Sequence, residues 1–130
     1  MPRPLRRLAL FTALVVAAAC AARNPAADAV DAPNPVVVFN NQSLYQADVY
    51  AISSSGSQVR LGTVQPGRRE RLRVSNTALG GDRQIVVAAR LLSRSRTPTS
   101  GRIGLLPGDT IEVVLTSDAN SLTVLPVARP

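Results

Sequence analysis

Residues 44–65, LYQADVYAISSSGSQVRLGTVQ, carry the pattern that decides the fold class. In the first half, Tyr45, Ala47, Val49 and Ala51 lie on one side of an alternating run, and a period of two is typical of a half-buried β-strand. A serine-rich loop follows, in which Gly56 is free to adopt a positive φ. The alternation resumes after a short loop, and this short separation predicts a β-hairpin. The second strand of the hairpin is expected to place Val59, Leu61 and Thr63 on one face.

Similar short runs, rich in β-branched residues, occur on both sides of the hairpin. Turns of Gly, Pro, Asn and Ser separate them at a spacing of roughly 8–15 residues, and no helical periodicity competes with them. Strands are therefore expected at residues 35–39, 44–51, 59–63, 69–74, 85–91, 103–105, 111–116 and 122–127. The connections include a type II turn at Pro66-Gly67, a loop over residues 75–82 and a polar connection over residues 93–101.

The fold class predicted from this pattern is all-β. It is a small antiparallel two-sheet sandwich of about 7–8 strands, immunoglobulin-like or transthyretin-like. Pro126 indicates that the last strand lies at a sheet edge, because proline cannot donate to a strand ladder. With few aromatic residues in the chain, the core must come from Val, Leu, Ile and Ala.

Upstream of this domain, residues 8–20 form an apolar run that ends in the single cysteine of the chain, Cys20. Arg3, Arg6 and Arg7 precede the run, and this order of a basic head, a short apolar core and small residues is that of an export signal. The apolar segment is shorter than the roughly 20 residues that a membrane-spanning helix needs. The chain is therefore expected to comprise a signal peptide (residues 1–19), a flexible Ala-, Pro- and Asp-rich tether (residues 20–34) and the β-sandwich (residues 35–130).

The residues Ala17-Ala18-Ala19-Cys20 resemble the lipobox of bacterial lipoproteins, although that family usually carries Leu, Val or Ile where this chain has Ala17. The resemblance implies cleavage after Ala19, a diacylglyceryl group on the Cys20 thiol, and often a fatty acid such as palmitate on the new N-terminus. It implies an exported protein that is anchored in a membrane of the cell envelope, the outer one if the organism has two. The same residues satisfy the Ala-x-Ala rule of ordinary signal peptidase, so a secreted, soluble periplasmic or extracellular binding protein is the alternative.

A second resemblance rests on turn chemistry within the domain. The segments RLGTVQPG (residues 60–67) and LPGDT (residues 106–110) resemble parts of small sandwich domains of bacterial surface lipoproteins that have no assigned activity. The resemblance covers roughly residues 35–127. Together with the lipobox and the arginines of the domain, it leads us to expect a structural or interaction module whose partners are the membrane, through the lipid anchor, and an envelope protein or an anionic surface.

Residues that could carry catalysis are scarce. The chain has no histidine, which excludes Ser-His-Asp and Cys-His arrangements and any His-ligated metal site. Cys20 belongs to the processing site, and the acidic residues of the domain are scattered: Asp48, Glu70, Asp82, Asp109, Glu112 and Asp118. We therefore expect a protein that is not an enzyme and that holds no cofactor or metal.

Arginine supplies all fifteen basic residues of the chain. Removal of residues 1–19 leaves twelve Arg against eight acidic residues, a net charge of +4. Arg69, Arg71 and Arg73, which we call the arginine stripe, recur at every second position and so share one strand face. The stripe is a candidate anion-binding patch; the alternative is a solvated face that discourages edge-to-edge pairing. Nucleic acid is not expected as a partner because no aromatic residues are interleaved with the arginines, and the oligomeric state is not indicated.

Overall fold

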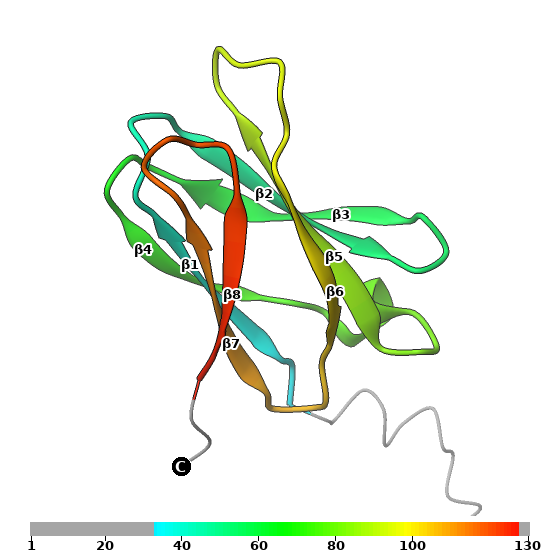
Figure 1. Cartoon of the computed structure of the whole chain (residues 1–130). Helices are drawn as coiled ribbons and strands as arrows, with labels where there is room; N and C mark the ends of the chain where they lie inside the picture. Colours follow the sequence, from blue (N-terminus) through cyan, green and yellow to red (C-terminus); the bar gives the residue numbers. More distant parts are fainter. Residues whose placement is uncertain (1–32, 128–130) are drawn as a thin grey trace, which may run out of the picture.

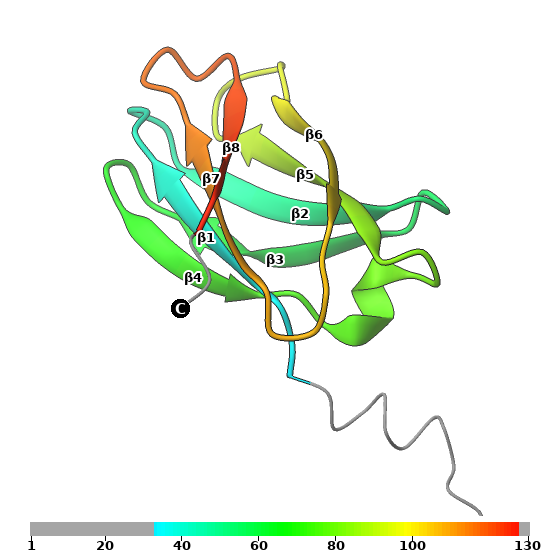
Figure 2. The same ribbon diagram turned by 60° about the horizontal axis from the view of Figure 1, so that its bottom comes forward.

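The computed structural model of the chain describes residues 33–127, so Cys20, the predicted signal peptide and nearly all of the predicted tether lie outside the described residues. The described part forms two four-stranded β-sheets packed face to face (Figures 1 and 2). Its elements are β1 (Val36–Asn41), β2 (Ala47–Ser53), β3 (Gln58–Val64), β4 (Arg69–Arg73), the 3-10 helix η1 (Asn76–Leu79), β5 (Gln84–Leu91), β6 (Thr99–Gly104), β7 (Thr110–Leu115) and β8 (Leu122–Pro126). The all-β two-sheet sandwich predicted from the alternating pattern is therefore confirmed.

The strand order is β4-β1-β7-β8 in one sheet and β3-β2-β5-β6 in the other; we call them the β1 sheet and the β2 sheet. The β2–β3 hairpin and the edge position of β8 agree with the sequence prediction. One pairing does not, because β1 runs parallel to β7, with Val36 opposite Thr110. A parallel pair needs a long crossover, and here the whole β2 sheet is built between the two strands. All other pairings between the described strands are antiparallel.

A β-bulge in the hairpin corrects the predicted faces of β3. Val49 lies opposite Gly62 whereas Tyr50 lies opposite Arg60, so Leu61 is the extra residue. Beyond the bulge the pleat is inverted with respect to the predicted alternation. Thr63 therefore points outward beside its partner Asp48, and the fully buried Val64 takes the inward position.

Two predicted connections contain more structure than the sequence indicated. In residues 75–82, Ser75 caps η1 by accepting a hydrogen bond from the Ala78 N–H at 3.3 Å, and the helix buries Ala78 and Leu79. The predicted connection over residues 93–101 is shorter than expected, because β6 begins at Thr99. There the buried Ser100 hydroxyl accepts a hydrogen bond from the Val87 N–H at 2.8 Å, where the β5–β6 ladder is irregular.

The core lies between the inward faces of the two sheets and consists of aliphatic side chains with one aromatic ring. Phe39 on β1, Val49 on β2, Val87 on β5 and Leu115 on β7 are completely buried, as is Leu79 of η1. The aliphatic composition expected from the sequence is thus confirmed. Each such side chain contributes about 1.5–3 kcal/mol of hydrophobic stabilisation.

The two ends of the sandwich differ in what they hold. At one end, the N-terminal pole, the Gly108 N–H donates to the Pro33 carbonyl (3.0 Å) and the Val36 N–H donates to the Asp109 carbonyl (2.8 Å), so the chain enters beside the β6–β7 turn. The opposite end, the loop pole, gathers the four connections formed by residues 42–46, 65–68, 92–98 and 116–121 (Figure 1). Backbone hydrogen bonds link these connections, for example from the Leu92 N–H to the Gln46 carbonyl at 2.9 Å.

Candidate functional site

The arginine stripe lies on the outward face of β4, at the edge of the β1 sheet, and all three residues are exposed. The next strand inward presents Val38 between Arg71 on one side and Glu112 on the other. Val38 retains only 5% of its exposed surface although it points away from the core. The predicted shared face is therefore confirmed, and the long stems of such side chains shield apolar surface beneath them.

One residue of the arginine stripe, Arg69, forms an ion pair with a carboxylate of the same sheet. Arg69 Nη2 lies 3.1 Å from Glu112 Oε2, and the ion pair crosses β1 from β4 to β7. The side chains of Arg71 and Arg73 make no hydrogen bond or ion pair with any residue between 33 and 127. Because β4 is antiparallel to β1, Arg73 lies toward the N-terminal pole and Arg69 toward the loop pole.

The outward face of the β2 sheet carries a polar network that the sequence did not reveal. Asp48 Oδ1 accepts hydrogen bonds from Thr63 Oγ1 at 2.6 Å and from Arg60 Nη2 at 2.9 Å. These bonds, first that from Thr63 and then that from Arg60, lower the pKa of Asp48 below its usual value. Arg90, directly opposite Asp48 on β5, adds a smaller attraction in the same direction. The network depends on the Leu61 bulge, since the predicted alternation placed Arg60 and Thr63 on opposite faces.

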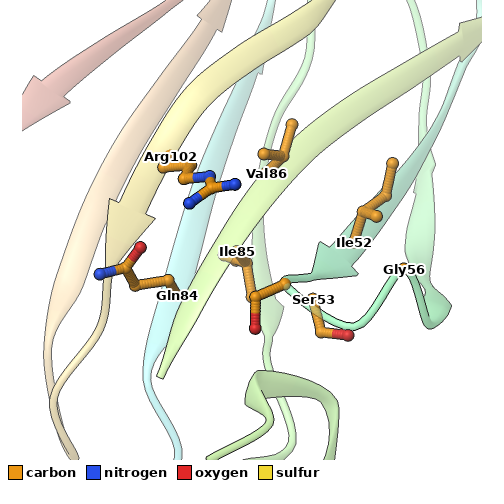
Figure 3. Close-up of a pocket in the computed structure, with 8 residues that line it drawn as sticks. Ile52, Ser53, Gly56, Gln84, Ile85, Val86 and Arg102 are labelled. Carbon is orange, nitrogen blue, oxygen red and sulfur yellow. The ribbon is translucent and has the colours of Figure 1, made fainter. Parts of the chain in front are cut away.

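Residues of the described part line a smaller and a larger hollow on this face. The smaller, of about 130 Å³, lies between the β2–β3 connection and the start of β5, and its lining includes Ser53, Gly56, Gln84 and Arg102. Figure 3 shows the Arg102 side chain reaching from β6 toward β5 beside Val86. This volume is well below the roughly 300–1,000 Å³ of small-molecule sites, so the hollow has room for a few waters or a small ion.

The larger hollow, of about 470 Å³, lies at the loop pole beneath the β5–β6 connection. Asp48 and Arg90 form its floor, and residues 91–95 form its wall. Arg94 in this wall lies over the Tyr45 ring, with its guanidinium carbon 5.1 Å from the ring centroid, and Nη1 donates to the Asp118 carbonyl at 3.2 Å. The wall also holds Ser93 at a positive φ of 66°.

Three other acidic residues serve local structure. The Asp118 carboxylate accepts hydrogen bonds from the Thr116 hydroxyl and from the backbone and side chain of Asn120, and these bonds lower its pKa. Asp82 accepts from the Gln84 N–H at 3.3 Å, and the Asp109 carboxylate accepts from the Leu106 N–H at 2.9 Å within the β6–β7 turn. Within residues 33–127, no group of three or more His, Cys, Asp or Glu could hold a metal ion. No helix in the same range is long and apolar enough to cross a membrane.

Comparison with known proteins adds little to this description. No protein-family model matches the chain, and no curated protein matches it. Among solved structures, the chain is similar to the NMR structure of a protein from Eubacterium rectale, with a TM-score of 0.46 and 10% sequence identity. The similarity covers 75% of this chain and 93% of that one.

Proposed function

We propose that the protein is a lipoprotein of the cell envelope, held in a membrane through an acylated Cys20, and that its β-sandwich is a non-enzymatic structural or interaction module. The observation that carries the proposal is the apolar run that ends in Ala17-Ala18-Ala19-Cys20 behind a basic head. Small residues before the cysteine allow the backbone into a peptidase cleft, and the thiol is the nucleophile that acylation needs.

The geometry of the domain agrees with attachment from one end. The described chain begins at Pro33, which is hydrogen-bonded to Gly108 at the N-terminal pole. An anchor on the N-terminal side of Pro33 therefore joins the sandwich at this pole, and the four connections of the loop pole lie at the far end from it (Figure 2). Those connections can then meet other components of the envelope.

In this proposal the acyl chains, not the arginine stripe, hold the protein on the membrane. Burial of hydrocarbon contributes about 0.8 kcal/mol per methylene, so one chain binds weakly while two or more bind firmly. Attraction between exposed arginines and anionic headgroups is screened by salt. The stripe acts as the solvated face of an edge strand, where repeated like charges disfavour pairing with a second sheet.

Fractionation of cells that express the protein with its own N-terminal segment tests the proposal. The wild-type protein should stay with membranes at about 1 M salt, where the Debye length is about 3 Å. Cys20→Ala should give either an uncut precursor or a soluble domain. A variant with all three stripe residues changed to Gln serves as the matched control and should stay with the membranes.

Two outcomes would contradict the proposal. Wild-type protein in the soluble fraction would favour the secreted alternative, in which ordinary signal peptidase releases the domain. A processed Cys20→Ala protein that stays on membranes at low salt, but not when the stripe is changed, would make the stripe the functional anion-binding patch.

A further inference from the structure

The loop pole exposes large apolar side chains beside the larger hollow. Leu92 is 61% exposed and lies in the wall of the hollow. Leu44, which is 87% exposed, belongs to the neighbouring connection. The hydrogen bond from the Leu92 N–H to the Gln46 carbonyl joins these two connections. The loop pole therefore exposes one large apolar side chain in the wall of the hollow and a second on the adjoining connection.

The same region carries a surplus of positive charge. Of the residues that line the hollow, Arg90 and Arg94 are positive and Asp48 is negative, which leaves a net charge of +1, and the adjacent Arg60 is paired with Asp48. Asp48 Oδ1 is already engaged by Arg60 and Thr63. The Arg90 side chain, although opposite Asp48, makes no hydrogen bond with any other described residue and is exposed at the floor of the hollow.

Arg94 is positioned before any ligand arrives. Its stacking on Tyr45 and its hydrogen bond to the Asp118 carbonyl fix the guanidinium at the rim. A guanidinium has five N–H donors, so most of them remain for a ligand. A fixed arginine loses less conformational entropy on binding than a freely moving one.

We propose that the hollow beneath the β5–β6 connection binds a segment of a partner protein that carries acidic and large apolar side chains. A carboxylate of the segment pairs with Arg90 on the floor, and its apolar side chains pack against Leu92 and Leu44. A phosphate or a lipid headgroup would satisfy the arginines but would offer nothing to the leucines. The hollow lies away from the N-terminal pole, and its binding chemistry is independent of the anchor at Cys20.

Nuclear magnetic resonance of the ¹⁵N-labelled full chain in a zwitterionic detergent tests the proposal. The probe is the peptide Glu-Leu-Glu-Leu-Glu-Leu at concentrations up to about 1 mM, which detects weak association. Its addition should shift the amide signals of residues 44–48 and 90–95. Arg90→Gln should weaken binding by up to about fivefold, as the loss of one exposed charge pair does, and Leu92→Gln should weaken it as well. Arg71→Gln removes the same charge from the other sheet and should leave binding unchanged.

Three results would overturn the proposal. One is the absence of shifts in residues 44–48 and 90–95 at the highest peptide concentration. Another is equal binding of the uncharged peptide Gln-Leu-Gln-Leu-Gln-Leu, which would remove the role of the arginines. The third is that vesicles containing phosphatidylglycerol displace the peptide from Arg90 whereas neutral vesicles do not, because the hollow would then be a site for anionic lipid.

Discussion

Asn41 at the end of β1 is the polar residue on which the loop pole depends most. Its side chain is completely buried and makes four hydrogen bonds. Nδ2 donates to the carbonyls of Tyr45 (2.7 Å) and Val64 (3.1 Å), while Oδ1 accepts from the Ser43 N–H (3.0 Å) and hydroxyl (2.7 Å). Because Val64 belongs to the other sheet, these bonds join both sheets to the first connection.

Asn41→Ala should destabilise the domain by about 2–4 kcal/mol. In the variant the Ser43 hydroxyl no longer donates to Oδ1 and can donate its one proton to the Tyr45 carbonyl, so the main losses fall on the Val64 carbonyl and the buried Ser43 N–H. Each buried polar group left without its partner costs about 1–3 kcal/mol. The expected loss is a large part of the roughly 5–15 kcal/mol that stabilises a typical domain.

Equilibrium unfolding in urea, followed by circular dichroism, measures this loss. With a slope of about 1.5 kcal/mol per molar urea, the midpoint should fall by about 1.3–2.7 M while the slope stays constant. Asn40→Ala is the matched control, because Asn40 lies on the outward face of β1 and should cost less than about 0.5 kcal/mol. A loss below about 1 kcal/mol for Asn41→Ala, or one no larger than that of the control, would refute the reasoning.

Two further predictions concern charged residues. Changing all three residues of the arginine stripe to Gln should alter the free energy of unfolding by no more than about 1 kcal/mol, because they are exposed and only Arg69 is paired. A urea titration in which the variant is already unfolded before urea is added would contradict this prediction. Because hydrogen bonds lower the pKa of folded Asp48, its contribution to stability is present above the unfolded pKa of about 3.9 and is lost as the pH falls through the lower folded value. The Tm of Asp48→Asn should therefore lie below that of the wild type at pH 7 and converge with it near pH 2, whereas a constant difference would exclude this role.

Local pattern predicted much of this fold because strand period and turn chemistry are encoded over a few residues. The alternation around Val49 predicted β2, and Pro66-Gly67 predicted a turn in which Gly67 indeed has a φ of 70°. The exposed face of the arginine stripe also followed from its spacing. In each case the residues that set the structure are adjacent in sequence.

The features that the sequence did not predict depend on contacts between distant segments. The parallel pairing of β1 with β7 joins residues about 75 positions apart, and nothing within either strand specifies its neighbour. Asn41 lies in a run typical of turns, yet tertiary packing buries it under Val64 and Tyr45. The Asp48 network required the bulge at Leu61, which changes the face of every later residue in β3.

The most direct test of the proposed function is the intact mass of the protein, purified from cells that process it with its own N-terminal segment. Anchoring through Cys20 predicts a chain that begins at Cys20 and exceeds the mass of its amino acids by a diacylglyceryl group, with or without one further acyl chain. An unmodified chain that begins at Cys20, Ala21 or Arg23 would contradict the proposal and would identify a secreted, soluble protein.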